Sequence, residues 1–194
     1  MQDKIERIAN VIRKVAIAAS SQLNKDCLWH TLAAKYLLAH NQIESHLKIG
    51  YAAWRIGQED GAVVTHMPIK GYKYQPHEIP FHCWLEIDDF IFDVTTYQLE
   101  AKMKMLDAAD NSSTEITWCP EFLYDHVSNK KPFVAVQQLL PGMYFYEEQK
   151  WLSDYIKYYT IVDRDPVLED AEILLMAFHN PSVLIIGPNH IKGE

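Results

Sequence analysis

The feature that most constrains the fold is the stretch FHCWLEIDDFIFDVTT, residues 81–96, which predicts two short strands joined by a tight turn. Every second residue of the first strand is apolar, and this set is Cys83, Leu85 and Ile87. If residues 88 and 89 form the two-residue turn, the second strand places Phe90, Phe92 and Val94 opposite this set. Because a slip of one residue would expose the whole apolar face, burial fixes this register.

The same register places His82 and Asp93 together on the face away from that apolar layer. They become diagonal neighbours on adjacent strands, with backbones about 7 to 8 Å apart, within the reach of their side chains. A carboxylate that accepts a hydrogen bond from one imidazole nitrogen fixes the tautomer and leaves the other nitrogen free as a base. The hairpin therefore predicts an oriented base that needs a nucleophile.

Cys27 is the best candidate for that nucleophile. The pattern CLWHTLAAKYLLAH predicts a helix over 27–40 with Asp26 as its N-cap, and the positive end of a helix dipole favours a thiolate in the first turn. The adjacent Asp26 carboxylate acts against the thiolate. Cys83 is expected to be a core residue because it points to the opposite face from His82, and Cys119 has no identifiable acid–base partner.

The order of a cysteine at a helix start, a histidine on a strand and an aspartate on the next strand resembles the transglutaminase-like superfamily of papain-type cysteine enzymes. The segments that carry the resemblance are DCLWHTLAAKYLL with Cys27, IGY with Gly50 and Tyr51, HCWLE with His82, and FDVT with Asp93. They span about residues 20–97. The resemblance implies an α+β, papain-like fold in which the cysteine helix packs on an antiparallel sheet that carries the histidine and the aspartate.

The function implied is that of a cysteine-dependent hydrolase or acyltransferase with Cys27, His82 and Asp93 as its catalytic triad. Its substrate would be a peptide, a protein or a small compound with an acyl or amide group, and no cofactor is implied. Gln22 is the nearest candidate for the oxyanion donor beside the Cys27 amide. The predicted substrate-binding residues are Tyr72 and Tyr74, in the proline-rich loop 68–80, and Trp84.

Two other interpretations use the same residues. The chain could be a binding module that kept the fold and lost turnover, which the charge of Asp26 beside the thiol would favour. Cys27 and His30, one helical turn apart, could instead bind a metal with His46 or His66. Neither a CxxC nor an HExxH pattern accompanies them, so we expect no metal.

Composition excludes several classes of protein. The 194 residues carry 18 basic and 26 acidic side chains, a net charge of −8, without a cluster of Lys and Arg, so we expect no nucleic-acid partner. Charged residues interrupt the N-terminal helical pattern, so neither a signal peptide nor a membrane segment is expected there. Three cysteines without paired spacing indicate free thiols in a reducing compartment, the cytoplasm.

The remaining pattern predicts one α+β domain over residues 1–194, with residues 98–194 as an elaboration of the core. Helices are expected at 3–19 and near 97–108, 147–159 and 166–178, and strands at 46–56 and 61–67. Short segments are expected around 115–119 and 132–137. The run VLIIG at 183–187 predicts one last buried strand.

Overall fold

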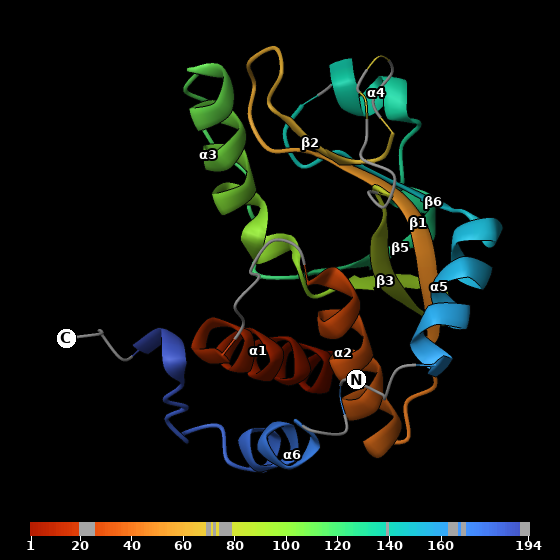
Figure 1. Cartoon of the computed structure of the whole chain (residues 1–194), viewed down its shortest axis with the longest axis vertical. Coiled ribbons are helices and arrows are strands. Elements are labelled where there is room, and N and C mark those ends of the chain that lie inside the picture. The colour runs from red at the N-terminus through yellow and green to blue at the C-terminus, as the bar shows by residue number, and fades with distance from the viewer. Residues whose placement is uncertain are drawn as a thin grey trace.

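The computed structural model of the chain describes residues 1–19, 26–68, 71, 73, 79–138, 140–162, 167 and 170–190 (Figure 1). The helices are α1 (Gln2–Ala19), α2 (Cys27–His40), α3 (Leu99–Asp110), α4 (Phe133–Gln138), α5 (Lys150–Val162) and α6 (Ala171–His179). The strands are β1 (His46–Arg55), β2 (Val63–His66), β3 (His82–Ile87), β4 (Phe90–Asp93), β5 (Leu123–His126) and β6 (Tyr144–Glu148). Short 3-10 turns lie at Thr96–Gln98, Val127–Asn129 and Pro188–His190. The chain is thus an α+β protein.

The strands form one antiparallel sheet in the order β2-β1-β3-β4-β5, with β6 paired to β1. The long strand β1 organises it, because β3 pairs with its first half and β2 with its second half. β6 pairs with the middle of β1, largely at residues that also pair with β2 or β3. It therefore lies along one edge of β1, while β2 and β3 share the other edge. Three strands therefore meet on β1, and one of them, β6, comes from the distant C-terminal half of the sequence.

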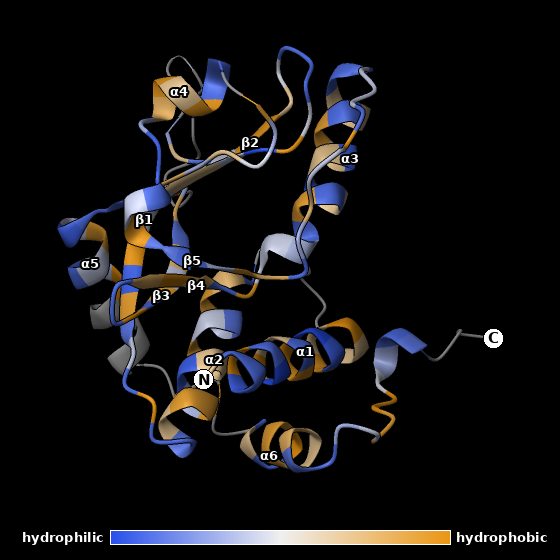
Figure 2. Ribbon diagram, turned by 180° about the vertical axis from the view of Figure 1, so that it is seen from behind, coloured by the Kyte–Doolittle hydropathy of each residue, from blue (hydrophilic) through white to orange (hydrophobic). Residues whose placement is uncertain are grey.

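The predicted hairpin register is confirmed. Leu85 pairs with Phe92 and Ile87 with Phe90, around a turn at Asp88 and Asp89. Its apolar face packs on helices α1, α2 and α6, which gather at one end of the molecule (Figure 1). Figure 2 shows hydrophobic residues along β3 and β4, as this burial requires.

The second face of the hairpin is buried as well. Trp84 and Ile91 on this face pack into another apolar cluster, with Trp54 of β1, Tyr146 of β6 and Met103 of α3. The face that carries His82 is therefore the lining of a second core. A charged or polar side chain on it must find its partners inside the protein.

The C-terminal half departs most from the sequence expectation. The structure confirms helices near the expected positions but adds β5 and β6, which the sequence reading missed, and segment 132–137 is helical. The run 183–187 is neither a strand nor buried throughout, since Leu184 is 78% exposed and Ile186 is 67% exposed. Val183 and Ile185 alone pack against the helical cluster. This segment thus buries two of its apolar side chains against the helices without pairing with a strand of the sheet.

Gly50 tests the junction of β3, β1 and β6. A Cβ atom at this position would lie 2.0 Å from the backbone oxygen of Glu147. Gly50→Ala is therefore expected to push β6 away from β1 and to lower the free energy of unfolding by about 1 to 3 kcal/mol or more, measured by chemical denaturation.

Gly61→Ala is the control for this prediction. Unlike Gly50, Gly61 has a positive φ, +87°, but no atom lies within 4 Å of its added Cβ. It should lose only about 1 kcal/mol from backbone strain. Equal losses in the two variants would contradict a steric role for Gly50.

Candidate functional site

Cys27 is the first residue of α2, as the sequence predicts, and it is 8% exposed. Thr31, one turn along the helix, ties this helix start to the sheet, because its hydroxyl donates to the carbonyl oxygens of Cys27 at 2.8 Å and of Cys83 at 3.1 Å. The thiol is thereby held at the beginning of β3, beside the positive end of the helix dipole.

His82 and Asp93 form a hydrogen-bonded pair, as the hairpin register predicts. His82 Nε2 donates to Asp93 Oδ2 at 2.7 Å, and both side chains are 0% exposed. The second ring nitrogen, Nδ1, forms no hydrogen bond of regular geometry with the part of the chain that the structure describes. Because Nε2 bonds Asp93 and Cys27 lies close enough to shift the pKa of His82, Nδ1 is the nitrogen left to exchange a proton with the thiol.

The Asp93 carboxylate is satisfied on all sides. Its Oδ1 accepts from the amide of Thr95 at 2.8 Å and from the Thr95 hydroxyl at 2.7 Å. Its Oδ2 also accepts from the hydroxyl of Tyr146 at 2.7 Å. Burial alone would raise the pKa of Asp93, but the charge and hydrogen bond of His82, with Tyr146 and Thr95, lower it below its usual range. The acid therefore stays ionised inside the core.

The protonation of His82 and Cys27 follows from this arrangement. Burial opposes the charged imidazole, but Asp93 and the thiol outweigh it and raise the pKa of His82 to about 9. The pKa of Cys27 is lowered well below its ordinary value by the hydrogen bond with Cys83 and by the charge and hydrogen bond of His82, against the effect of burial. Both shifts favour a thiolate on Cys27 and an imidazolium on His82.

Cys83 brings a second thiol to the site. It is a fully buried core residue, as predicted, yet its thiol also contacts Cys27 in an apolar cluster with Ile49 and Leu152. The strand does point Cys83 away from His82, but α2 approaches at the first residues of β3, where Cys27 reaches both. Burial and the neighbouring Cys27 sulfur raise the pKa of Cys83 well above its ordinary value, so Cys83 is the thiol that keeps its proton.

Aromatic rings enclose the histidine. Trp54 packs edge-on to His82 with ring centres 4.8 Å apart, and its Nε1 donates to the Tyr146 hydroxyl at 2.8 Å. Trp84, predicted to bind substrate, is only 1% exposed and stacks in the same cluster. Two residues further along β3 than His82, it points into the interior, so its side chain offers almost no surface to a substrate.

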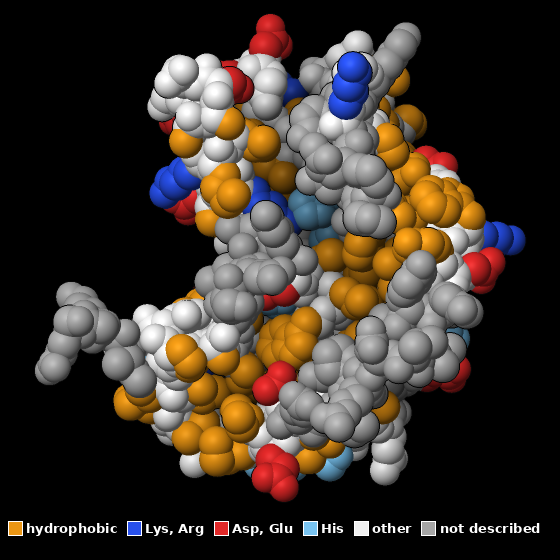
Figure 3. Space-filling model, viewed as in Figure 1, with side chains coloured by type: hydrophobic (Ala, Val, Ile, Leu, Met, Phe, Trp, Pro, Cys, Tyr) orange, Lys and Arg blue, Asp and Glu red, His pale blue; other side chains and the backbone are white. Residues whose placement is uncertain are grey.

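The structure adds two residues that the sequence reading did not assign to the triad's surroundings. Lys102 of α3 lies close enough for its positive charge to lower the pKa of Cys27. Its Nζ is 2.8 Å from Nε2 of His66 on β2. Figure 3 shows Lys or Arg and His side chains together in a hollow between α3 and the sheet. No sequence motif marks this pair, because α3 and β2 meet only in the folded chain.

Three predicted site residues, Gln22, Tyr72 and Tyr74, lie outside the described residues, so their roles stay predictions. Asp26 occupies the N-cap position, but its side chain makes no capping hydrogen bond. It pairs instead with His30, whose Nδ1 lies 3.3 Å from the Asp26 carboxylate.

The metal interpretation finds no support in the geometry. His30, its proposed ligand, has Nε2 2.9 Å from the Tyr97 hydroxyl, and Nδ1 3.0 Å from the backbone oxygen of Asp26. Over the described ranges, no three His, Cys, Asp or Glu side chains lie close enough together to hold a metal ion.

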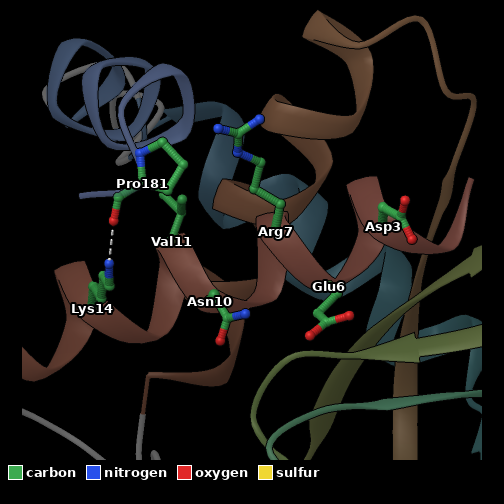
Figure 4. Close-up of a pocket in the computed structure, with 7 residues that line it drawn as sticks. All are labelled: Asp3, Glu6, Arg7, Asn10, Val11, Lys14 and Pro181. Carbon is green, nitrogen blue, oxygen red and sulfur yellow. Dashed lines mark hydrogen bonds between the residues drawn. The ribbon is translucent and has the colours of Figure 1, made fainter. Parts of the chain in front are cut away.

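A separate hollow lies on the outer side of α1 (Figure 4). It is lined by Asp3, Glu6, Arg7, Asn10, Val11, Lys14 and Pro181. At one end of it, Lys14 donates to the backbone oxygen of Pro181 at 2.7 Å. This hollow contains no cysteine or histidine, so it lacks the thiol and imidazole that Cys27 and His82 bring together, and the region around these two residues is the candidate site.

The fold and site define an α+β protein with a buried Cys–His–Asp cluster, and the comparisons with known proteins add a family. The profile of the family described as "Protein of unknown function (DUF2026)" matches residues 1–117, and the chain belongs to this family. The matched range contains Cys27, His82 and Asp93. No curated protein matches the sequence significantly.

A solved structure described as "The crystal structure of genomics APC5867" is similar over 95% of this chain and 83% of its own, with a TM-score of 0.66 and 18% identity. At that identity the likeness shows a shared fold.

Among the described residues, no helix is both long enough and apolar enough to pass through a membrane.

The ionisation of the site predicts an unusual pH profile for alkylation. Because the pKa of Cys27 is lowered and that of His82 is raised to about 9, the rate of Cys27 alkylation by iodoacetamide should be nearly constant from weakly acidic pH to about pH 9. An ordinary thiol would instead gain reactivity up to its pKa of about 8.5. Mass spectrometry of the labelled peptides measures the rate at each cysteine.

Cys119 is the internal control for this profile. It is partly exposed, and burial raises its pKa, so its labelling at neutral pH should be slow. If Cys119 reacts first and Cys27 follows an ordinary thiol profile, the ion pair is absent.

Proposed function

We propose that the chain is a cysteine-dependent hydrolase or acyltransferase of the transglutaminase-like, papain-type class. The observation that carries the proposal is the buried hydrogen bond between His82 Nε2 and Asp93, which leaves Nδ1 for the Cys27 thiol at a helix start. A Cys–His–Asp arrangement of this kind suits nucleophilic attack on an amide or acyl carbonyl. The shared order of motifs over residues 20–97 supports the class, and the antiparallel sheet agrees with it.

The reaction would proceed in two steps. The Cys27 thiolate attacks the carbonyl carbon, and the imidazolium of His82 gives its proton to the leaving group as the acyl–sulfur bond forms. Water or an amine then attacks the thioester, and His82 Nδ1 takes the proton of that second nucleophile. The acyl group leaves on the new oxygen or nitrogen, and Cys27 is regenerated as a thiolate.

Asp93 would act through His82 and not on the substrate. Its hydrogen bond holds the proton on Nε2 and stabilises the imidazolium. Tyr146 of β6 helps to orient Asp93, because its hydroxyl donates to the same carboxylate oxygen. The Tyr146 hydroxyl in turn accepts a hydrogen bond from the indole N–H of Trp54. This chain of hydrogen bonds keeps the carboxylate charged and oriented.

The proposal predicts a covalent acyl intermediate on Cys27. Incubation with an activated aryl ester should add one acyl group to Cys27, detected by intact mass and peptide mapping, with an initial burst of the aryl alcohol. Cys27→Ser should reduce the rate by roughly 10³-fold or more, because serine is not ionised here. The unfolding midpoint should change little, since the two side chains are close in size.

Cys119→Ser is the matched control, and it should leave both the burst and the acylated site unchanged. An alternative is a binding module that kept the fold without turnover. Normal alkylation of Cys27 without any acylation by a panel of esters and amides would favour that alternative and contradict the proposal.

Because Asp93 acts through hydrogen bonds, its substitution should slow the reactions of Cys27 without disturbing the apolar core. In Asp93→Asn an amide N–H₂ faces the donors His82 and Tyr146, so the imidazole should adopt the other tautomer and the thiolate should be lost. Alkylation and acylation of Cys27 near neutral pH should both slow by at least tenfold. Chemical denaturation should show a loss of about 1 to 3 kcal/mol from the broken hydrogen bonds.

Tyr146→Phe provides the graded comparison, because it removes one hydrogen bond to Asp93 and keeps the ring. It should slow both reactions less than Asp93→Asn does. If Asp93→Asn lowers stability while the reactivity of Cys27 stays at the wild-type level, the acid is structural only.

A further inference from the structure

Lys102 is a buried cation without an anionic partner in contact. Its side chain projects from α3, the residue is 8% exposed, and no carboxylate within the described ranges forms an ion pair with it. Its ammonium has three N–H donors, and the described part of the chain supplies one acceptor, Nε2 of His66, at 2.8 Å. Buried lysines are usually paired, because an unpaired charge loses its hydration.

His66 does not neutralise that charge. Burial and the positive charges of Lys102 and His82 hold the pKa of His66 well below its ordinary value, so its imidazole is neutral. Burial lowers the pKa of Lys102 too, but Cys27, Asp93 and Asp26 act in the opposite direction from a distance. The shared proton therefore belongs to Lys102, and His66 orients the ammonium as a neutral acceptor.

This ammonium is connected to the candidate site through His66. The ring of His66 packs edge-on to the ring of His82 with centres 5.1 Å apart, and edge-on to Trp54 at 5.4 Å. Lys102 is thus held by a partner that itself contacts the catalytic imidazole. The hollow between α3 and the sheet, where Figure 3 shows cationic and histidine side chains, is the approach to this region.

The charge balance changes during the proposed reaction. In the resting state the Cys27 thiolate offsets part of the field of Lys102. When Cys27 becomes a thioester, that negative charge disappears, while His82 and Asp93 still face each other. A negative group on the acyl donor would then supply the anionic partner that the Lys102 ammonium has lost.

We propose that Lys102, oriented by His66, binds an anionic group of the substrate, a carboxylate or a phosphate, next to the carbonyl that Cys27 attacks. The assignment to an acyl substrate rests on the proposed function, but the anion site itself does not. Lys is a compact point charge, which suits one anionic group and not a planar two-point contact. The substrate class is therefore an acidic acyl donor.

Two alkylating reagents of nearly equal shape test the anion site directly. Iodoacetate carries a carboxylate where iodoacetamide carries an amide, and both react with the thiolate. At Cys27 the ratio of the iodoacetate rate to the iodoacetamide rate should exceed the ratio at Cys119 by tenfold or more. An equal ratio at the two cysteines of the wild-type protein overturns the proposal without any variant.

Substitutions then assign the preference to Lys102. Lys102→Met should lower the ratio at Cys27 at least tenfold, and Lys102→Arg should keep most of it. Lys104→Met is the matched control, since Lys104 lies on the same helix but is exposed and paired with Glu100, and it should leave the ratio unchanged. If Lys102→Met slows both reagents equally, Lys102 only stabilises the thiolate, and the proposal fails.

Competition identifies the anion. Succinate or inorganic phosphate should slow the alkylation of Cys27 by iodoacetamide in the wild-type protein and lose this effect in Lys102→Met. Protection by succinate alone assigns a carboxylate, and protection by phosphate alone assigns a phosphate. Protection by neither contradicts the site.

Aryl esters separate this proposal from the proposed function. A hemisuccinate aryl ester should acylate Cys27 faster than the matching neutral acetate, and Lys102→Met should reduce that preference. If the two alkylating reagents show the preference but no ester acylates Cys27, the anion site stands and the acyl-transfer function fails. If esters acylate Cys27 without any preference for the anionic donor or reagent, the function stands and the anion site fails.

Discussion

The ion pair between His82 and Asp93 is the interaction on which the arrangement of the site depends. Both side chains are completely buried, so each loses the hydration that would stabilise its charge in water. The loss is offset because the carboxylate accepts hydrogen bonds from His82, Thr95 and Tyr146. Removing any of these partners would leave a buried charge unsatisfied, so the surrounding sheet must keep β3, β4 and β6 in one fixed register.

That requirement connects the two halves of the chain. Tyr146 comes from β6, which is far from the hairpin in sequence but pairs with the same central strand as β3 does. Lys102 comes from α3 and closes the other side of the site through His66. The segment after residue 97, expected as an elaboration of the core, thus contributes a hydrogen-bond donor and a cation to the candidate site.

The core of the site could be predicted because its constraints are local. Alternating apolar residues and a two-residue turn leave one register that buries the hairpin, and this register brings Asp93 beside His82. The helical pattern of residues 27–40, preceded by Asp26 at the N-cap position, likewise places Cys27 in the first turn of α2. Both inferences rest on residues within about one strand or one helix of each other, where sequence spacing and spatial neighbourhood coincide.

The sequence by itself therefore determined the α+β class, the hairpin register and the positions of the cysteine, histidine and aspartate on their elements. Only the tertiary structure decided that Cys83 lies against Cys27, that Trp84 is enclosed, that Tyr146 donates to Asp93, and that Lys102 contacts His66. Those contacts join elements far apart along the chain, and they depend on how the helices and β6 pack on the sheet. Side-chain periodicity specifies which face of an element is buried, but it carries no record of which distant element covers that face.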